Sequence, residues 1–213
     1  MSRRKTILAT GEIYHVFNRS THKIQIFKSD KDFQIFTEAS LYYLQQFPKV
    51  KFSFYRRQKD KHVFQLDDKL VSMLNYCLMP NHYHFTLRQE AEDGIKNFIQ
   101  RLCGSYAHYF NKKYDVNGAL FSGNFKAVRI SDERQLLHLS RYIHLNPVTD
   151  YIVNKPEDYK YSSYIQYLHK EKSNLIDPTL ILDILGKQSY QKFVLDRVGY
   201  QRDLSRIKQL ILD

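Results

Sequence analysis

Two histidines, His82 and His84, stand two positions apart in the segment MPNHYHF (79–85). Side chains alternate between the two faces of a β-strand, so a strand here would place both imidazoles on one face, roughly 7 Å apart along the backbone. Neutral imidazole nitrogens at that separation can bind one metal ion. The same spacing also fits two polar histidines on a half-exposed sheet, so residues from elsewhere in the chain must decide between the two interpretations.

A second pair of candidates lies in the segment RYIHLNPV (141–148). Tyr142 and Asn146 are four positions apart and would be neighbours on one face of a helix, with His138 one turn earlier. We expect Pro147 to end this helix and to leave the Asn146 amide at the helix tip, free to turn towards a ligand. The alternatives are a tyrosine packed on a sheet and an asparagine that only caps the helix.

The hydrophobic periodicity predicts the elements that would position these side chains. Segments rich in β-branched and aromatic residues predict strands, and apolar residues at helical spacing predict helices. We expect strands at 12–20, 70–79, 82–88 and near the end of 118–130, and helices at 30–47, 93–114 and 131–146. Ser29 or Asp30 is expected to cap the first helix, and Ser131 the last. The charged stretch 48–69 is expected to form an inserted hairpin or loop.

This order of elements, strand-helix-strand-strand-helix-strand followed by one more helix, is that of a ferredoxin-like fold with an addition. The sequence therefore predicts an α+β protein in which an antiparallel sheet of βαββαβ topology carries helices on one face. The added helix bears Tyr142. Residues 173–213 predict a C-terminal helical extension, so we divide the chain into a domain over 1–172, with its insertion at about 48–69, and this extension.

Composition and charge restrict the function classes. A net charge of +11, from 33 basic and 22 acidic residues, predicts an anionic partner, and nucleic acid before a membrane surface. No segment approaches the roughly 20 apolar residues of a membrane span, and the N-terminal segment lacks a secretory core. Cys77 and Cys103 lack metal-binding spacing, so we expect both to be reduced, in a cytoplasmic protein.

Basic and aromatic side chains recur together in several segments. Tyrosine is abundant, at 17 residues, and tyrosine or phenylalanine beside basic groups can stack unpaired bases. These features predict a groove for single-stranded nucleic acid, although any one of the basic residues could equally belong to a solvated face. The candidates for DNA contact are Arg56, Arg57, Lys59, Lys112, Lys113, Lys126 and Arg129.

Five segments, in order along the chain, resemble the IS200-like single-tyrosine transposases, and most closely their REP-associated branch. They are YHVFNRS, YCLMPNHYHFTL, YFNKKYDVNGALFSGNFKAV, YIHLNPV and PEDYKYSSYIQYL, within residues 11–170. Four positions depart from the usual pattern: Tyr83 stands where an aliphatic residue is common, Asn124 and Thr149 where Arg is common, and Tyr161 where Trp is common. The two missing arginines concern the contact with DNA and not the catalytic set.

The resemblance implies an HUH-type endonuclease and strand transferase that acts on single-stranded DNA. His82 and His84 match its metal-binding histidines. Tyr142 matches its nucleophile, and Asn146 matches its third, amide-bearing ligand. The implied cofactor is Mg²⁺ or Mn²⁺, and attack by Tyr142 would leave a 5′-phosphotyrosine link and a free 3′-OH. His138 is a candidate for orienting Tyr142 or its substrate.

The resemblance also implies a substrate, since relatives in this branch recognise short imperfect hairpins in REP-like repeat DNA. The alternatives are a domesticated, non-catalytic relative that only binds nucleic acid, and a replication initiator or relaxase with the same chemistry. The extension at 173–213 favours a monomer over a homodimer. We expect His15 to pack in the interior, because its neighbours in alternation, Ile13 and Phe17, are apolar.

Overall fold

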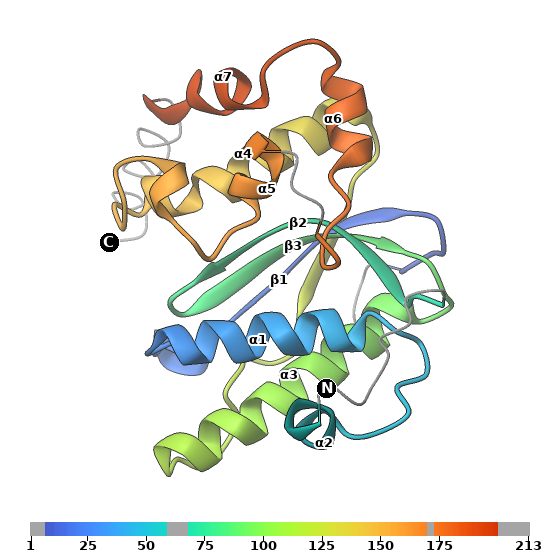
Figure 1. Ribbon diagram of the computed structural model, residues 1–213, viewed down its shortest axis with the longest axis vertical. Helices are drawn as coiled ribbons and strands as arrows, with labels where there is room; N and C mark the ends of the chain where they lie inside the picture. Colours follow the sequence, from blue (N-terminus) through green and yellow to red (C-terminus); the bar gives the residue numbers. More distant parts are fainter. Residues whose placement is uncertain (1–6, 59–67, 170–172, 200–213) are drawn as a thin grey trace.

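Four strands form one antiparallel sheet in the computed structural model, which describes residues 7–58, 68–169 and 173–199. They are β1 (Ile13–Arg19), β2 (Val71–Met79), β3 (His82–Gln89) and β4 (Lys126–Arg129). Their order across the sheet is β2-β3-β1-β4, and every neighbouring pair is antiparallel (Figure 1). This arrangement confirms the predicted ferredoxin-like α+β fold.

Helices cover both faces of this sheet. α1 (Asp30–Tyr43) and α3 (Gly94–Tyr114) pack on one face, and α4 (Glu133–Thr149) lies on the other together with the C-terminal helices (Figure 1). The remaining helical segments are η1 (Thr21–Lys23), α2 (Phe52–Arg57), η3 (Pro156–Asp158), α5 (Tyr164–His169), α6 (Thr179–Leu185) and α7 (Tyr190–Leu195). None of the described helices is long and apolar enough to cross a membrane.

Burial along the strands shows which side chains reach each layer. β2 is buried at every position, because elements pack on both of its faces. In β1 the burial alternates, with Tyr14 and Val16 fully buried on the side of α1 and α3. His15 and Phe17 point to the opposite side, where α4 packs. The face that bears His15 is therefore the one that the added helix covers.

Pro147 lies inside α4, which continues to Thr149, so the prediction that this proline ends the helix is wrong. Proline has no N–H to donate to the Ile143 carbonyl four residues earlier. The Asn146 side chain supplies a donor in its place, with Nδ2 lying 3.4 Å from the Ile143 oxygen and 2.8 Å from the Tyr142 oxygen. The helix tolerates the proline because a neighbouring amide compensates for the lost hydrogen bond.

The sequence predicted N-terminal caps for two helices, and one of the two predictions is correct. Ser29 is the N-cap of α1, as expected. The cap of α4 is Asp132 and not Ser131, because the Asp132 carboxylate accepts a hydrogen bond from the N–H of Gln135 at 2.8 Å. A carboxylate at this position also interacts favourably with the positive end of the helix dipole.

The hairpin or loop predicted at 48–69 is wrong in part. Residues 52–57 form the short helix α2. Phe52 is buried against the rings of Tyr42 and Tyr55, and this burial of apolar surface stabilises the short helix. Residues 59–67 of the same stretch lie outside the described residues.

The described part of the C-terminal extension packs directly on α4. His144 is fully buried, with Nδ1 2.7 Å from the Tyr190 hydroxyl and Nε2 2.8 Å from the Ser163 hydroxyl. The Arg141 guanidinium lies over the ring of Phe193 and donates to its carbonyl oxygen at 3.2 Å. These contacts hold the helix of the candidate nucleophile between the sheet and α7.

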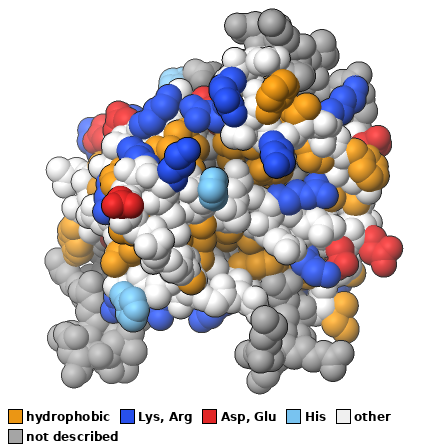
Figure 2. All heavy atoms as spheres, turned by 90° about the horizontal axis from the view of Figure 1, so that it is seen from below, with side chains coloured by type: hydrophobic (Ala, Val, Ile, Leu, Met, Phe, Trp, Pro, Cys, Tyr) orange, Lys and Arg blue, Asp and Glu red, His pale blue; other side chains and the backbone are white. Residues whose placement is uncertain are grey.

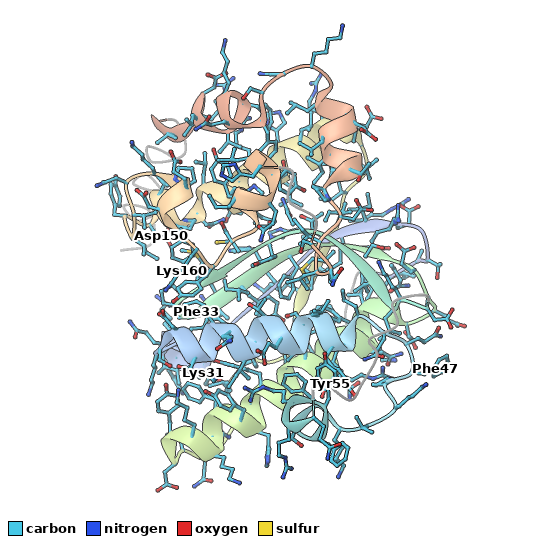
Figure 3. The ribbon with its side chains drawn as sticks, in the orientation of Figure 1. Lys31, Phe33, Phe47, Tyr55, Asp150 and Lys160 are labelled. Carbon is cyan, nitrogen blue, oxygen red and sulfur yellow. The ribbon has the colours of Figure 1, made fainter. Side chains whose placement is uncertain are left out.

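The segment 159–163, which follows η3 and is called the strap below, crosses the free edge of β2. The Leu78 N–H donates to the Tyr161 carbonyl at 2.9 Å, and the Tyr161 ring stacks on Phe33 of α1 with 3.5 Å between centroids. Lys160 pairs with Asp30, and Figure 3 shows Lys160 and Phe33 together at this end of the sheet. The strap therefore covers the strand edge and joins the α4 layer to α1.

Asp32, in the first turn of α1, is a fully buried carboxylate that ties α1 to α3. It accepts hydrogen bonds from Lys113 Nζ at 2.7 Å and from the hydroxyls of Tyr109 and Tyr114 at 2.8 and 2.6 Å. Burial alone would raise the pKa of Asp32. The hydrogen bonds from Lys113, the two tyrosines and Ser29 outweigh burial and lower the pKa to about 2.

We expect Asp32→Asn to lower the free energy of unfolding by about 2–4 kcal/mol at neutral pH, because Lys113 loses its counter-ion and the helix loses part of its cap. The stabilisation by the carboxylate is complete above the unfolded-state pKa of about 3.9 and is lost as the pH falls towards the folded value. Urea unfolding should therefore show the difference between wild type and variant shrinking as the pH is lowered from neutrality to about 2.

Asp30→Asn is the matched control for Asp32→Asn. Its carboxylate is exposed and forms a surface pair with Lys160, so its loss should change stability little. Equal destabilisation by the two substitutions would show that the buried network around Asp32 stabilises the fold no more than a surface ion pair does.

Candidate active site

β3 and α4 bring the two histidines and the tyrosine together. His82 and His84 point from β3 towards the α4 layer, with their ring centroids 4.9 Å apart. The ring of Tyr142 lies edge-on to His84, with 5.7 Å between centroids. Tyr142 is 36% exposed, so its phenol is not enclosed in the interior. Strand alternation places the two imidazoles on one face, and helix packing brings to them a phenol from a distant part of the sequence.

A cavity of about 590 Å³ lies over these rings. The residues that line it are Phe17, Asn18, Arg19, Lys23, Asn81, His82, His84, Ser122, Lys126, Tyr142 and Asp150. Three cationic side chains, Arg19, Lys23 and Lys126, therefore face the same space as the phenol and the imidazoles. Such a concentration of donors suits a phosphate group.

Burial controls the charge of the two imidazoles. Burial, with a smaller effect of Arg19, lowers the pKa of His82 to about 4. Burial and the neighbouring rings of His82 and His15 hold the pKa of His84 well below its usual range. Both rings are therefore neutral at pH 7, and each keeps the nitrogen lone pair that a metal ligand requires.

One nitrogen of each imidazole already has a partner. His82 Nδ1 lies 2.6 Å from Asn81 Oδ1, which can only accept, so this nitrogen carries the proton. His84 Nδ1 lies 2.9 Å from His15 Nε2. Within the described ranges, neither His82 nor His84 has a hydrogen-bond partner at Nε2. The two Nε2 atoms are the ones left for a ligand.

Asn146 lies beside the phenol but is engaged with its own helix. It is 6% exposed and is not among the residues that line the cavity. Its Nδ2 donates to carbonyl oxygens of α4, so the prediction of an amide free at a helix tip is wrong. Its Oδ1 takes no part in those two bonds and is the atom that could bind a cation.

The phenol of Tyr142 is protonated at neutral pH. Burial raises the pKa of Tyr142, the Asp150 carboxylate raises it further, and a hydrogen bond with the Asn146 side chain lowers it in part. Asp150 is the C-cap of α4 and lines the cavity, and burial raises the pKa of its carboxyl (Figure 3). A protonated phenol is a poor nucleophile, so the reaction needs an acceptor for its proton.

The donor set fits a hard divalent cation that keeps much of its own coordination shell. In the part of the chain that the structure describes, no three His, Cys, Asp or Glu side chains converge as a metal site. Two neutral imidazoles and one amide leave several positions for water and phosphate oxygens, as Mg²⁺ and Mn²⁺ prefer. A structural zinc site with four protein ligands does not fit.

Of the predicted DNA contacts that the structure describes, Lys126 lines this cavity. Arg56, Arg57 and Lys112 line a separate groove of about 700 Å³ between α1, α2 and α3. Figure 2 views the molecule from that side and shows Lys and Arg side chains spread over it. The predicted contacts therefore fall on two sides of the sheet and do not form one surface.

The other predicted residues lie apart from the cavity. Lys113 and Arg129 form ion pairs with Asp32 and Glu12, and Lys59 lies outside the described residues. His138 is exposed, and its Nδ1 lies 2.7 Å from the Arg141 guanidinium. It does not line the cavity, and its role in orienting the phenol stays a prediction.

The residues at the site that were missed from the sequence include His15, Arg19, Lys23, Asn81 and Asp150. His15 is packed as expected, half-buried and stacked on Phe17, but its contact with the predicted ligand His84 was not foreseen. The register of β1 with β3 was the missing information: Phe17 pairs with His84 and Arg19 with His82. Both faces of β1 are partly apolar, so hydrophobicity alone did not distinguish them.

Comparisons with known proteins bear on the family resemblance and on the fold. The sequence profile described as "Transposase IS200 like" matches residues 54–146, a segment that contains both strand histidines, Tyr142 and Asn146. This match confirms the resemblance seen in the sequence. No curated protein sequence matches the chain significantly.

Among solved structures, a REP-associated tyrosine transposase bound to a REP hairpin superposes with a TM-score of 0.57 and 14% identity, covering 83% of this chain and 94% of that one. A protein from Deinococcus radiodurans R1 gives a TM-score of 0.37 and 12% identity, covering 67% and 95%. The tRNA(His) guanylyltransferase of Saccharomyces cerevisiae gives 0.39 and 8%, covering 91% and 80%. The first of these supports the fold, and the other two lie too low to carry an argument.

Proposed function

Residues 54–146 match the IS200-like transposases, enzymes that nick and join DNA, and from this premise we propose that the chain cuts single-stranded DNA through a covalent bond to Tyr142. The observation that carries the proposal is the Tyr142 ring, 5.7 Å from that of His84 and in one cavity with Arg19 and Lys126. A phosphodiester in this cavity would meet cations, imidazoles and the phenol together.

In the proposed reaction the Tyr142 oxygen forms a bond to the scissile phosphorus while the bond from phosphorus to the 3′ oxygen breaks. The leaving 3′ oxygen takes up a proton, and Asp150, which lines the same cavity, can accept the phenol proton. A Mg²⁺ or Mn²⁺ ion held by His82, His84 and Asn146 would neutralise charge on the phosphate in the transition state. The 5′-phosphotyrosine keeps the phosphodiester energy, so a second 3′-OH can reverse the step and join strands.

We propose a single strand with a REP-like hairpin as the substrate. A net charge of +11 and the basic groove between α1, α2 and α3 support binding to DNA. The transposase of similar fold was solved with a REP hairpin. We also propose that a monomer acts, because α6 and α7 of the same chain already pack on α4.

A covalent-capture assay tests the proposal. The full chain is incubated with Mn²⁺ and hairpin-bearing single strands labelled at the 3′ end, because the fragment downstream of the cut is the one that stays on Tyr142. We expect a labelled protein band that survives denaturation. Binding without any such band, across different hairpins and metal ions, would favour a protein that only binds nucleic acid.

Lys126→Ala is expected to weaken binding of single-stranded DNA at low salt, since Lys126 is exposed and lines the cavity. Removal of one phosphate contact should flatten the plot of log affinity against log salt concentration by about 0.7. Fluorescence anisotropy over a salt series measures this slope. Lys96→Ala is the control, because Lys96 is an exposed lysine of α3 paired with Asp93. The same change of slope in both variants would contradict a phosphate contact at Lys126.

A further inference from the structure

His15 on β1 contacts the predicted metal ligand His84, and the proposed mechanism gives His15 no role. Its Nε2 lies 2.9 Å from Nδ1 of His84. The two rings are stacked, with centroids 5.1 Å apart and 20° between their planes. Phe17 stacks on His15 from β1 itself at 4.7 Å, and the Tyr142 ring lies edge-on at 6.2 Å. Packing thus holds the His15 ring in place against both the ligand and the nucleophile.

A hydrogen bond between two neutral imidazoles has two possible directions, and they differ in their consequence for metal binding. If His84 Nδ1–H donates to His15 Nε2, then His84 Nε2 keeps a lone pair and can bind a cation. If His15 Nε2–H donates to His84 Nδ1, then the proton of His84 sits on Nε2, and that nitrogen cannot be a ligand. The partner at Nδ1 therefore sets which tautomer of His84 is favoured, and with it how readily Nε2 binds a cation.

His82 shows which direction matches the rest of the site. Asn81 Oδ1 accepts from His82 Nδ1, and Asn81 Nδ2 donates to the Lys23 carbonyl at 3.4 Å, which fixes the orientation of the amide. His82 is thus held with its lone pair on Nε2. A ligating histidine usually donates its second N–H to an acceptor in this way. His84 has the equivalent arrangement only when His15 is the acceptor.

Resting on the proposed function, we propose that His15 is a positioning residue that accepts the Nδ1 proton of His84 and so keeps His84 Nε2 available for the divalent cation. This assignment requires the proton of His15 on its own Nδ1. His84 lines the cavity, so its Nε2 atom can meet a ligand there. His15 does not touch the phosphate or the cation in this role.

Two variants of the full chain separate hydrogen bonding from packing. His15→Gln places an amide oxygen that can accept from His84 Nδ1, whereas His15→Leu has a similar size and cannot accept. Phe17→Leu is the packing control, because it changes the stacking on both His15 and His84 and removes no hydrogen-bonding group. Thermal unfolding of each variant establishes that it is folded before any comparison.

Two readouts avoid DNA cleavage altogether. Long-range ¹H–¹⁵N NMR of the metal-free protein at alkaline pH reports which nitrogen of His84 carries the proton, and calorimetric titration with Mn²⁺ alone reports affinity. We expect His84 to be protonated at Nδ1 in wild type and in His15→Gln, with Mn²⁺ affinities within about 3-fold. We expect His15→Leu to lose this preference and to bind Mn²⁺ about 10- to 100-fold more weakly.

A proton on His84 Nε2 in the wild type, or unchanged Mn²⁺ affinity in His15→Leu, would overturn the role of His15. A loss of Mn²⁺ affinity in Phe17→Leu as large as the loss in His15→Leu would also overturn this role, because packing would then account for the effect. If the wild type binds no Mn²⁺, the proposed metal chemistry fails, and the NMR result still decides the direction of the hydrogen bond. The two failures are therefore distinguishable.

Discussion

Tyr142→Phe is expected to abolish the covalent protein–DNA adduct, with a fall of roughly 10⁴-fold or more in its rate of formation. Only one oxygen is removed, and it is the atom that would attack the phosphate. The ring, its edge-on contact with His84 and the cations of the cavity stay in place. Affinity for the same single strand should therefore change by less than about 3-fold, because a single polar atom outside the phosphate contacts contributes little to binding.

The measurement for Tyr142→Phe combines denaturing gels for the adduct with anisotropy for binding. Tyr151→Phe is the matched control, since Tyr151 is an exposed tyrosine just beyond α4, 53% exposed. It should form the adduct at the wild-type rate. An adduct that persists in Tyr142→Phe and disappears in Tyr151→Phe would move the nucleophile to the other tyrosine.

His84→Ala is expected to reduce adduct formation by roughly 10³-fold, since it removes a predicted ligand and with it several kcal/mol of transition-state stabilisation by the cation. A chelator should have the same effect on the wild type, and added Mn²⁺ should restore the wild type but not the variant. Initial rates at a series of Mn²⁺ concentrations measure this. The loss should lie in the reaction more than in DNA affinity, because Arg19 and Lys126 remain.

His108→Ala serves as the control for His84→Ala. His108 lies on α3 and lines the groove on the opposite side of the sheet. Its replacement should leave the Mn²⁺ dependence unchanged. Full adduct formation by His84→Ala in the presence of chelator would remove the metal from the proposed mechanism and leave Tyr142 to act with the cationic side chains alone.

The predictions for Tyr142→Phe and His84→Ala both depend on how α4 is held over the sheet. His144 and Arg141 attach one side of the helix to Ser163, Tyr190 and Phe193, and the sheet-facing side presents Tyr142 to the imidazoles. The position of the phenol is therefore set by packing on both sides of α4. Sequence periodicity predicted the helix but not what would cover its second side.

The local features of the site were readable from the sequence because they depend on short-range geometry. The two-residue period of a strand places His82 and His84 on one face wherever that strand lies, and the same rule predicted β3 within one residue of its observed end. The helix at 131–146 followed from its apolar spacing and an acidic first turn. The ferredoxin-like order followed from the sequence of elements.

The features that were not predicted all depend on contacts between distant segments. Pro147 does not end α4, because the Asn146 amide replaces the missing donor and the helix is packed on both sides. His15 packs against His84, because the register of β1 with β3 sets which alternate residues share a face with His84.

By itself, then, the sequence determined the chemistry that is available: two imidazole rings on one strand face, a phenol and an amide one helical turn apart, and an excess of positive charge. Only the tertiary structure decided which side chains meet. It placed Arg19, Lys126 and Asp150 in the cavity and attached His15 to His84. The physical reason is that local periodicity orients a side chain within its own element, whereas strand register and helix packing orient the elements towards one another.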